Sequence, residues 1–303
     1  FDPILSSDST LSCAHCHHPN KGLADGLARA TGRDGHTLKR SAPTLWNTAF
    51  YTDYFWDGRA KTLEDQARGP LFSPEEMGNT PKELEKRLNA NSTYRQLFKD
   101  AFGKNLKGAI TTDHVVQALS HFQRTLVSMN SRYDQYLFGD QEALTHKEVQ
   151  GLTLFRSFLT RCTECHTPPL FTNFQTAIIG APESSGAAFD KGIEEIEDDP
   201  KQRGAFKVPS LRNIALTAPY MHSGGLKSLA DVVHFYSEGG GRGPLGIENQ
   251  YLHWHITPIR LSKKEEESIV SFLLSLTDEG NLPKIPATLP SGLSPVSGGH
   301  HAL

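Results

Sequence analysis

The sequence lacks three features that would point to a membrane, to nucleic acid or to a disulfide-stabilised fold. No apolar run approaches the ~18 residues of a membrane-spanning helix, so we expect no membrane span. The 31 basic and 34 acidic residues nearly balance, at a net charge of −3, which offers no basic surface for nucleic acid or an anionic membrane. Only four of the 303 residues are cysteine, and their positions exclude a disulfide framework.

All four cysteines fall in two C-x-x-C-H pentapeptides, Cys13-Ala14-His15-Cys16-His17 and Cys162-Thr163-Glu164-Cys165-His166. Two thiols one helical turn apart can add to the two vinyl groups of one porphyrin, and the adjacent histidine then lies beneath the iron as an axial ligand. The sequence therefore predicts two covalently bound haem c groups. Their attachment residues are Cys13, Cys16, Cys162 and Cys165, and their iron ligands are His17 and His166.

Two other chemistries use paired cysteines, but neither accounts for the histidines. A zinc site with four thiolates does not require a histidine after each pair. A thioredoxin-like redox pair uses one C-x-x-C in a βαβ context, which the sequence lacks. Haem attachment of this kind takes place outside the bacterial inner membrane in most c-type cytochromes, so we expect a periplasmic or exported protein. Because the chain starts at Phe1 rather than Met, we also expect it to have been processed or trimmed.

Helical patterns dominate, and convincing alternating strand patterns are lacking. Capping signals begin helices at Thr80, Thr145 and Ser262, and 113–128 carries Val115, Leu119, Phe122 and Leu126 at helical spacing. The helix after Thr145 is expected to place Leu152, Phe155 and Leu159 on one side and to run into the second haem motif. We predict an all-α fold of two tandem c-type cytochrome haem domains, over 1–140 and 141–278, with a tail over 279–303 that packs back on the first.

An internal repeat indicates two related modules. The segment 42–47 (APTLWN) resembles 208–213 (VPSLRN) at an offset of 166 residues (208 − 42), and the same offset relates Trp56 to His222. The haem motifs lie only 149 residues apart (162 − 13), so the second module carries 17 extra residues (166 − 149). These fit the acidic, glycine-rich stretch at 180–204. We interpret its charge run as a solvated loop or, less simply, as a docking patch for a basic partner.

The repeat also compares the two distal sides, where a sixth iron ligand would lie. At the offset of 166, Tyr236 corresponds to Pro70. A tyrosine phenolate can ligate iron, whereas proline has no side-chain donor. One interpretation is that Tyr236 closes the second haem and leaves the first open to a small oxidant. The other is that Tyr236 is an ordinary half-buried aromatic residue.

Polar residues after the first motif could serve an open iron. Gln66, Glu75 and Glu76 read as parts of a loop punctuated by proline and glycine. A carboxylate there can take a proton from one oxygen of peroxide and return it to the other. The alternative is that both glutamates only favour the N-terminus of the helix near Thr80.

Taken together, these residues resemble the bacterial di-haem cytochrome c peroxidase superfamily, which includes MauG, over nearly the whole chain. The resemblance rests on the stretches Phe1-Asp2-Pro3, Ala42-Pro43-Thr44, Phe55-Trp56-Asp57-Gly58-Arg59-Ala60, Glu76-Met77, Val208-Pro209-Ser210-Leu211-Arg212-Asn213 and Ala218-Pro219-Tyr220-Met221-His222-Ser223-Gly224. It implies a haem-dependent oxidoreductase of the peroxidase class. Family members normally carry more chain before the Phe-Asp-Pro stretch, so a preceding segment is expected.

By position, the resemblance assigns roles to four residues of the first module. Glu76 is implied to be the distal acid–base group, with Gln66 close by and Pro70 shaping the pocket. Trp56 is implied to lie between the haems and to relay electrons.

The resemblance also implies a calcium ion between the modules, held by the side chain at 41 and by the backbone carbonyls of Thr217 and Pro219. The usual asparagine is replaced by Ser41, a shorter ligand. In classical members a histidine before the Ala-Pro pair blocks the first haem until the enzyme is reduced. Here His36 lies nearer that pair, so we favour an exposed histidine over a ligand.

Residue 236 distinguishes two branches of the family. Classical peroxidases place Met fourteen residues after the histidine of Pro-Tyr-x-His, and MauG-like members place Tyr, as this chain does at Tyr236 after His222. Methionine favours ferrous iron and raises its potential, whereas a phenolate favours higher oxidation states.

We therefore interpret the sequence as a MauG-like enzyme. It would use hydrogen peroxide to form a high-valent dihaem state that oxidises Trp or another aromatic residue of a partner protein. One alternative is a classical peroxidase that reduces hydrogen peroxide with electrons from a small redox protein. The other is a non-enzymatic dihaem electron carrier, in which both irons would be six-coordinate.

Overall fold

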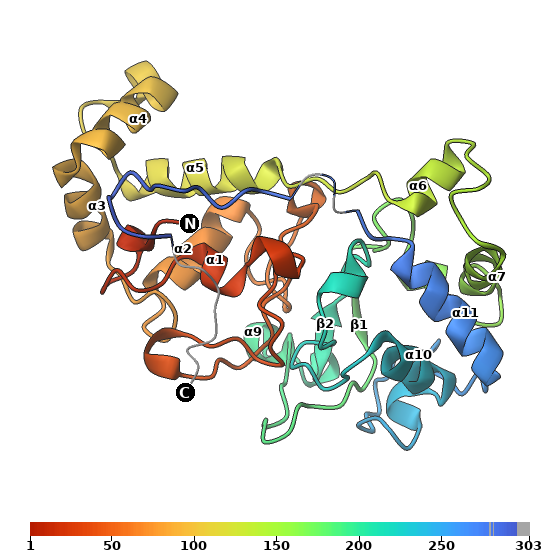
Figure 1. Cartoon of the computed structure of the whole chain (residues 1–303). Helices are drawn as coiled ribbons and strands as arrows, with labels where there is room; N and C mark the ends of the chain where they lie inside the picture. The colour runs from red at the N-terminus through yellow and green to blue at the C-terminus, as the bar shows by residue number, and fades with distance from the viewer. Residues whose placement is uncertain (279, 281, 296–303) are drawn as a thin grey trace.

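The computed structural model describes residues 1–278, 280 and 282–295, and these residues are mostly helical. Two lobes lie side by side, one formed by the N-terminal half of the chain and one by the C-terminal half (Figure 1). The predicted all-α class is confirmed. Within the described residues the only strands are β1 (Thr176–Ile178) and β2 (Ala205–Lys207), which pair antiparallel with Ala177 opposite Phe206.

The α-helices divide between the lobes. Those of the first are α1 (Cys13–Cys16), α2 (Leu63–Phe72), α3 (Pro81–Ala90), α4 (Ser92–Phe102) and α5 (Thr112–Arg124). Those of the second are α6 (Arg132–Leu137), α7 (His146–Phe155), α8 (Cys162–Cys165), α9 (Glu194–Glu197), α10 (Leu229–Ser237) and α11 (Lys263–Leu274). Short 3-10 turns occupy Pro3–Leu5, Pro19–Lys21, Arg33–Gly35, Thr48–Phe50, Gly103–Leu106, Pro200–Gln202, Ile214–Leu216 and Gly240–Arg242.

The predicted helix starts are confirmed at three caps. The side-chain oxygens of Thr80, Thr145 and Ser262 each accept a hydrogen bond from the backbone N–H three residues later. At Thr145 and Ser262 the glutamate at that position bonds back to the cap, which completes a capping box. Such caps satisfy amide groups that the first turn of a helix leaves without partners.

Two details of the predicted apolar faces are wrong. Helix α7 ends at Phe155 instead of continuing to the second haem motif, and Leu159 is 56% exposed. The chain turns after Phe155 because the Thr160 hydroxyl bonds to the Leu154 carbonyl and Arg161 adopts a left-handed backbone conformation. On α5, Phe122 points outward and makes an edge-on contact with Phe1 instead of joining the core.

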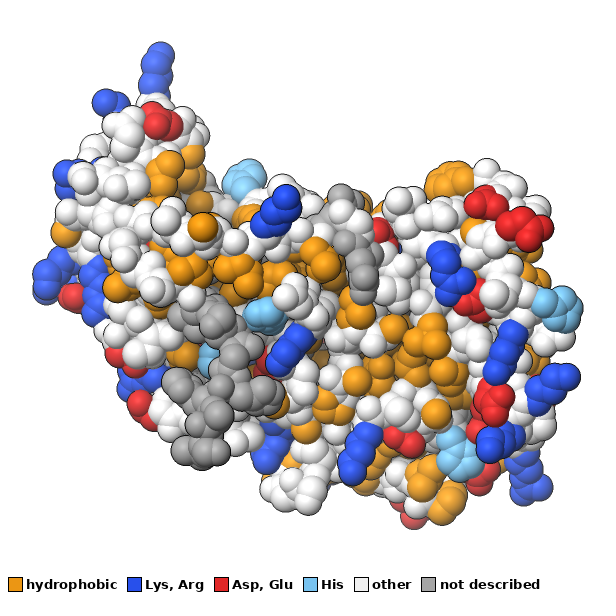
Figure 2. Space-filling model, viewed as in Figure 1, with side chains coloured by type: hydrophobic (Ala, Val, Ile, Leu, Met, Phe, Trp, Pro, Cys, Tyr) orange, Lys and Arg blue, Asp and Glu red, His pale blue; other side chains and the backbone are white. Residues whose placement is uncertain are grey.

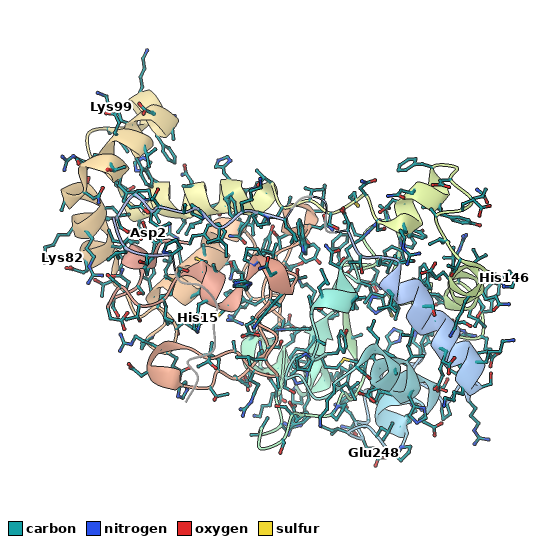
Figure 3. The ribbon with its side chains drawn as sticks, viewed as in Figure 1. Asp2, His15, Lys82, Lys99, His146 and Glu248 are labelled. Atoms are coloured by element: carbon teal, nitrogen blue, oxygen red, sulfur yellow. The ribbon has the colours of Figure 1, made fainter. Side chains whose placement is uncertain are left out.

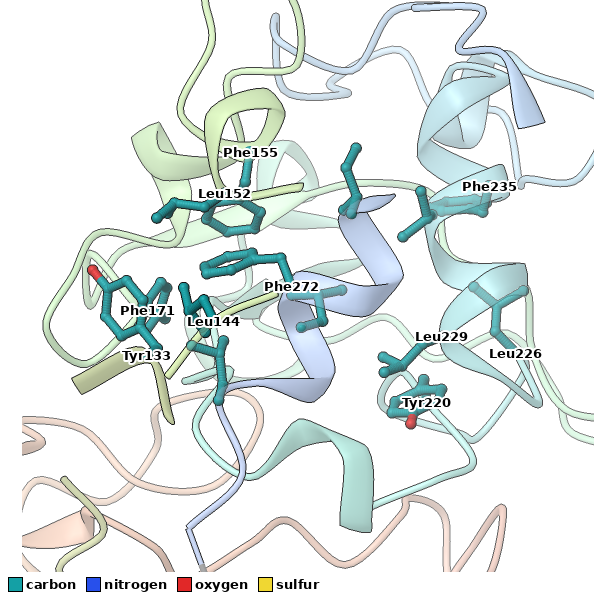
Figure 4. Close-up of a cluster of buried hydrophobic side chains, with 14 residues drawn as sticks. Tyr133, Leu144, Leu152, Phe155, Phe171, Tyr220, Leu226, Leu229, Phe235 and Phe272 are labelled. Atoms are coloured by element: carbon teal, nitrogen blue, oxygen red, sulfur yellow. The ribbon is translucent and has the colours of Figure 1, made fainter. Parts of the chain in front are cut away.

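Each lobe has its own apolar core. In the first, Leu71 of α2, Leu84 and Leu88 of α3 and Val116 of α5 are almost fully buried. In the second, aromatic side chains from α7, α11 and the loop after the second motif pack against one another at steep angles (Figure 4). Phe155, Phe171 and Phe272 lie at its centre, with ring centroids 5.1–6.1 Å apart. Burial of side chains of this size stabilises the fold by roughly 1.5–3 kcal/mol each.

The internal repeat is confirmed by matching hydrogen bonds. The Tyr54 hydroxyl donates to the Thr48 carbonyl (3.2 Å), and, 166 residues later, the Tyr220 hydroxyl donates to the Ile214 carbonyl (3.1 Å). Asn47 and Asn213 form a second matched pair, and both side-chain amides donate to Ser128, at its carbonyl and its hydroxyl respectively. The two modules are therefore related by an approximate internal symmetry, and their equivalent asparagines meet at Ser128.

Ion pairs connect the lobes where the insertion of the second module meets the first module around Arg40 and Trp56. We call this contact region the joint. Arg40 donates to Asp57 (2.5 Å) and to Asp190 (2.6 Å), and Lys39 contacts Asp190 at 3.1 Å. Burial opposes ionisation of Asp190, but the Arg40 guanidinium holds the pKa of Asp190 well below its usual value. The charge run at 195–198 is exposed, so the insertion combines a solvated stretch with a buried anchor at Asp190.

The described part of the C-terminal segment returns to the first lobe, as the blue trace in Figure 1 shows. The Asn91 amide donates to the Pro290 carbonyl (3.2 Å), and the Ser291 hydroxyl donates to Asp2 (2.7 Å). The rest of the segment predicted over 279–303 lies outside the described residues.

The surface mixes charges of both signs with apolar side chains on the face shown in Figure 2. Among the residues that the structure describes, no helix has both the length and the hydropathy to cross a bilayer.

The buried ion pair of the second module gives a stability prediction. Arg212 is almost fully buried and donates to both carboxylate oxygens of Asp134 (2.5 and 2.8 Å). Asp134→Ala leaves that charge without a partner, and we expect a loss of about 3–5 kcal/mol in the free energy of unfolding. Urea denaturation followed by circular dichroism measures it.

The matched control is Asp113→Asn, which removes the exposed Arg68–Asp113 pair, where Asp113 is 70% exposed. That change should cost less than about 1 kcal/mol. Equal losses in the two variants would contradict the assignment of Asp134 as a buried structural partner.

Candidate haem centres

Each C-x-x-C-H motif forms a single helical turn that brings its two thiols and its histidine together. In the first, α1 ends at Cys16, and the His17 amide donates to the Cys13 carbonyl (2.9 Å). In the second, the His166 amide donates to the Cys162 carbonyl (2.8 Å). Figure 3 labels His15 on α1, inside the first lobe. None of the four cysteines forms a disulfide, so all four can attach to haem vinyl groups.

The two motif histidines are oriented by the same hydrogen bond. Nδ1 of His17 lies 3.0 Å from the Leu23 carbonyl, and Nδ1 of His166 lies 3.0 Å from the Phe171 carbonyl. A carbonyl can only accept, so Nδ1 carries the hydrogen and Nε2 keeps its lone pair for a metal. Burial lowers the pKa of both rings, which favours the neutral form that ligates iron.

The surroundings of the first motif fit a bound haem. Burial, followed by the carboxylates of Asp25 and Glu76, raises the pKa of Cys16 to about 12. The hydroxyl of Ser12 and one carboxylate oxygen of Asp25 are buried without a hydrogen-bond partner among the described residues. Buried polar atoms rarely lack partners, so these two atoms fit contacts with a polar group of a haem bound beside α1.

The predicted loop around Pro70 is wrong in part, because Gln66 and Pro70 both lie on helix α2. Thr62 caps this helix by accepting from the Asp65 amide (3.0 Å). Pro70 has no N–H, so it leaves the Gln66 carbonyl without its usual helical donor. The two residues are four apart and therefore lie on the same face of α2.

Glu76 lies in a turn that α2 holds in place. Its amide donates to the Ser73 carbonyl (3.1 Å), and the next amide, from Met77, donates to the Pro70 carbonyl (3.0 Å). Burial raises the pKa of Glu76, while the positive charge of Arg59 opposes that rise. The Glu76 carboxylate in turn raises the pKa of both Cys13 and Cys16, in addition to their burial, so it lies beside the first motif.

His36 lies at the surface next to the other glutamate. Its Nε2 is 3.7 Å from the Glu75 carboxylate, and its side chain is 57% exposed. The loop is fixed there by a hydrogen bond from the Arg33 amide to the Glu75 carbonyl (3.0 Å). A Cβ added at Gly32 would come within 2.0 Å of that carbonyl, so the close approach requires glycine. This position agrees with an exposed histidine.

Tyr236 lies on α10, beside the second motif. Burial, and then the nearby thiols of Cys165 and Cys162, raise the pKa of the Tyr236 phenol. Its ring contacts Phe235 edge-on at 5.2 Å. The phenol is therefore neutral without a metal, and only the charge of a bound ion would favour its deprotonated form.

Trp56 lies at the joint between the lobes. Its indole N–H donates to the Ser41 carbonyl (2.9 Å), and its own carbonyl accepts from the Lys207 amide (2.8 Å). The internal symmetry repeats the second bond, because the Ser41 amide donates to the carbonyl of His222 (2.7 Å), the residue equivalent to Trp56. Trp56 is thus hydrogen-bonded to both modules.

The residues predicted to bind calcium lie on segments that meet at this joint. Ser41 contacts His222, while a Cβ at Gly22 would lie 3.0 Å from Thr217. Ser41, Thr217 and Pro219 offer only neutral oxygen atoms, whereas calcium prefers sites that include carboxylates. Among the described residues no cluster of three or more His, Cys, Asp or Glu side chains could hold a metal, so the fit to calcium is weak.

Sequence reasoning missed several charged residues at these sites. Arg59 is close enough to Glu76 to lower the pKa of that carboxyl, and it lies over the Phe55 ring at 3.5 Å. Arg59 and Phe55 both belong to the stretch at 55–60 that carried the resemblance. The Arg40–Asp190 contact joins residues 150 apart, and Lys207 contacts residues of the opposite lobe. No local pattern signals contacts of that range.

Comparisons with known proteins agree with this arrangement. The family described as di-haem cytochrome c peroxidase matches residues 1–142. The methylamine utilization protein MauG of Methylorubrum extorquens is 37% identical over 94% of this chain and 79% of its own length. The cytochrome c551 peroxidase of Nitrosomonas europaea is 35% identical over 96% and 81%, respectively. A MauG-like protein associated with microbial copper homeostasis superposes with a TM-score of 0.84 at 33% identity, covering 92% of this chain and 87% of that one.

Two haem-attachment turns in tandem all-α modules define a di-haem c-type cytochrome. This chain belongs to the di-haem cytochrome c peroxidase family, which includes MauG. It is a haem-dependent oxidoreductase of the peroxidase class, with two haem c groups as its cofactors.

The position of Glu76 predicts that its carboxylate carries protons during peroxide cleavage. Glu76→Gln should slow the reaction with peroxide by roughly 10²–10⁴-fold, as removal of an acid–base group does. Stopped-flow absorbance of the haem-loaded protein measures this rate. The pKa of Glu76 is raised above its usual value of 4.5, and only the deprotonated carboxylate can accept a proton. The wild-type rate should therefore begin to fall with decreasing pH while the pH is still above 4.5.

Glu75→Gln is the control, since it removes the neighbouring, exposed carboxylate. Its rate should stay close to that of the wild type. A rate in Glu76→Gln that equals the rate in Glu75→Gln would remove Glu76 from the reaction.

Proposed function

We propose that this protein is a MauG-like enzyme that uses hydrogen peroxide to oxidise aromatic residues, such as Trp, of a partner protein. The observation that carries the proposal is the position of the partly buried Tyr236 beside the Cys162 and Cys165 thiols, where the first module has Pro70. An anionic phenolate stabilises higher oxidation states of iron. Proline offers no ligand, so the first centre keeps a place for peroxide.

When bound, the two haem c groups would supply one iron that reduces peroxide and a second that shares the oxidising equivalents. The chain contributes ligation, proton delivery and electronic connection. His17 and His166 would hold the irons through Nε2, and Tyr236 would close the second site. Glu76 would move a proton at its carboxylate, while Gln66 and Pro70, on one face of α2, would bound the space that admits peroxide.

The hydrogen bonds of Trp56 support a connection between the two centres. On the first side, Trp56 bonds to Ser41, two residues before Pro43, whose backbone contacts the His17 ring. On the second side, Trp56 accepts from Lys207, two residues before the matching proline, which contacts the His166 ring. Short covalent segments, joined by one hydrogen bond at each histidine ring and two at Trp56, thus link the motif histidines, which suits transfer of electrons through Trp56.

A protein substrate need not enter a haem pocket, because electrons can pass through the surface of the enzyme. The partner is therefore a protein whose aromatic side chain loses electrons, and peroxide is the small-molecule oxidant. Since haem is attached to such motifs outside the inner membrane in most c-type cytochromes, we place the enzyme in the bacterial periplasm or among exported proteins.

The second candidate is a classical peroxidase that takes electrons from a small redox protein. The relative named cytochrome c551 peroxidase favours it, at 35% identity. In classical peroxidases a histidine blocks the first haem until the enzyme is reduced. The exposed position of His36 argues against such a block in this chain. A dihaem carrier without enzyme activity would require both centres to be six-coordinate, and Pro70 supplies no sixth ligand.

Peroxide added to the fully ferric, haem-loaded protein separates these functions. We expect a stable species two oxidising equivalents above the ferric state, without prior reduction, seen by absorption and Mössbauer spectroscopy. Tyr236→Met should abolish it, because a neutral thioether favours lower oxidation states. Tyr136→Phe, a change to another tyrosine packed against the same core, is the matched control and should behave like the wild type.

Formation of the species only after reduction of one haem would overturn the MauG-like proposal in favour of the classical peroxidase. Its survival in Tyr236→Met would remove Tyr236 as the ligand.

We also propose a calcium ion held weakly at Ser41, Thr217 and Pro219. Ser41→Asn restores the longer carboxamide of the family, and it should tighten calcium binding by about tenfold, because the carboxamide oxygen reaches closer to the ion than the serine hydroxyl does. Isothermal titration of chelator-treated protein measures the affinity. Equal affinities for the wild type and Ser41→Asn would exclude residue 41 as a ligand.

A further inference from the structure

Lys207 places an ammonium group at the joint between the lobes. Its Nζ donates to the Asp53 carbonyl (2.8 Å) and lies 4.2 Å from the centroid of the Tyr51 ring. Burial lowers the pKa of Lys207 to about 8, although Asp53 opposes the shift. The lysine belongs to β2 of the second module, and both of its side-chain partners belong to the first. Its charge is therefore held in a fixed place by contacts with the first lobe.

The internal symmetry relates Lys207 and its partners to the residues expected to bind calcium. Subtracting the offset of 166 from Lys207 gives Ser41, while adding it to Asp53 and Tyr51 gives Pro219 and Thr217. The backbone confirms the correspondence, since the Lys207 amide donates to Trp56 and the Ser41 amide donates to His222, its equivalent. The Lys207 ammonium thus occupies, in the second module, the place that the expected calcium ion would take in the first.

The lysine also lies close to the second haem motif along the chain. Two residues after Lys207, the backbone of Pro209 contacts the His166 ring. The next amide, from Ser210, donates to the Tyr51 hydroxyl (3.3 Å). The ring that contacts the ammonium is therefore itself bonded beside the proximal side of the second centre. Toward the first module, Lys207 donates from its amide to the Trp56 carbonyl and from Nζ to the Asp53 carbonyl.

We propose that Lys207 is a built-in cation that takes the place of a metal ion at the second centre and raises the reduction potential of the His166 haem. A fixed positive charge favours the ferrous state, which carries one positive charge less than the ferric state. The charge acts on the haem through space, so Lys207 tunes the centre and is not itself a catalytic residue. The inference rests on the proposed function only in that both haems take part in electron transfer.

The test is a reductive titration of the haem-loaded protein, without peroxide, followed by the absorption of each haem. Lys207→Met removes the charge and keeps the chain length. Lys207→Gln removes the charge but retains a donor for the Asp53 carbonyl, so it serves if the first variant does not fold. Both should shift the potential of the His166 haem to a lower value, and by more than that of the His17 haem. Lys207→Arg should keep the wild-type potential.

Lys61→Met is the matched control. Lys61 pairs with the side chain of Asp53, but it is 73% exposed, so solvent screens its charge and neither potential should move. Unchanged potentials in the neutral Lys207 variants, equal shifts at both haems, or an equal shift in Lys61→Met would each overturn the proposal. Because no peroxide is used, this outcome is separate from failure of the two-equivalent species to form.

Discussion

The whole arrangement depends on one hydrogen bond, made once in each module. The imidazole of the motif histidine donates from Nδ1 to a loop carbonyl, at Leu23 or at Phe171. Both carbonyls belong to residues with a left-handed backbone, φ 59° and 56°. That conformation turns the loop back toward the histidine, fixes the ring tautomer and directs Nε2 to the place of the iron. Without it, the two cysteines could bind a porphyrin but would not define its axial ligand.

The internal symmetry then makes the differences between the modules informative. Residues that only maintain the fold recur at the same offset, such as Tyr54 with Tyr220 and Asn47 with Asn213. Where the pairs differ in chemistry, we propose that the two centres differ in function. On the distal sides, the phenol of Tyr236 in the second module corresponds to Pro70 in the first. At the joint, the ammonium of Lys207 corresponds to the hydroxyl of Ser41. We regard these two substitutions as the means by which one fold gives one centre that reacts and one that stores charge.

Much of this could be read from the sequence, because the signals are local. The haem motifs and the caps at Thr145 and Ser262 depend on residues within one turn of each other. Helix α2 was missed, since Pro70 inside it argues against a helix, while the cap at Thr62 and the packing of Leu71 outweigh that cost. The joint could not be predicted, because Arg40 with Asp190 and Lys207 with Asp53 pair residues about 150 positions apart, and no local periodicity encodes such pairs.

The central claim is that the two centres are unequal, one open and one closed by Tyr236. Low-temperature electron paramagnetic resonance of the resting, fully ferric protein tests it most directly. The account predicts one high-spin ferric signal, from the His17 haem, together with one low-spin signal from the haem held by His166 and Tyr236. Two low-spin signals, or two high-spin signals, would contradict it.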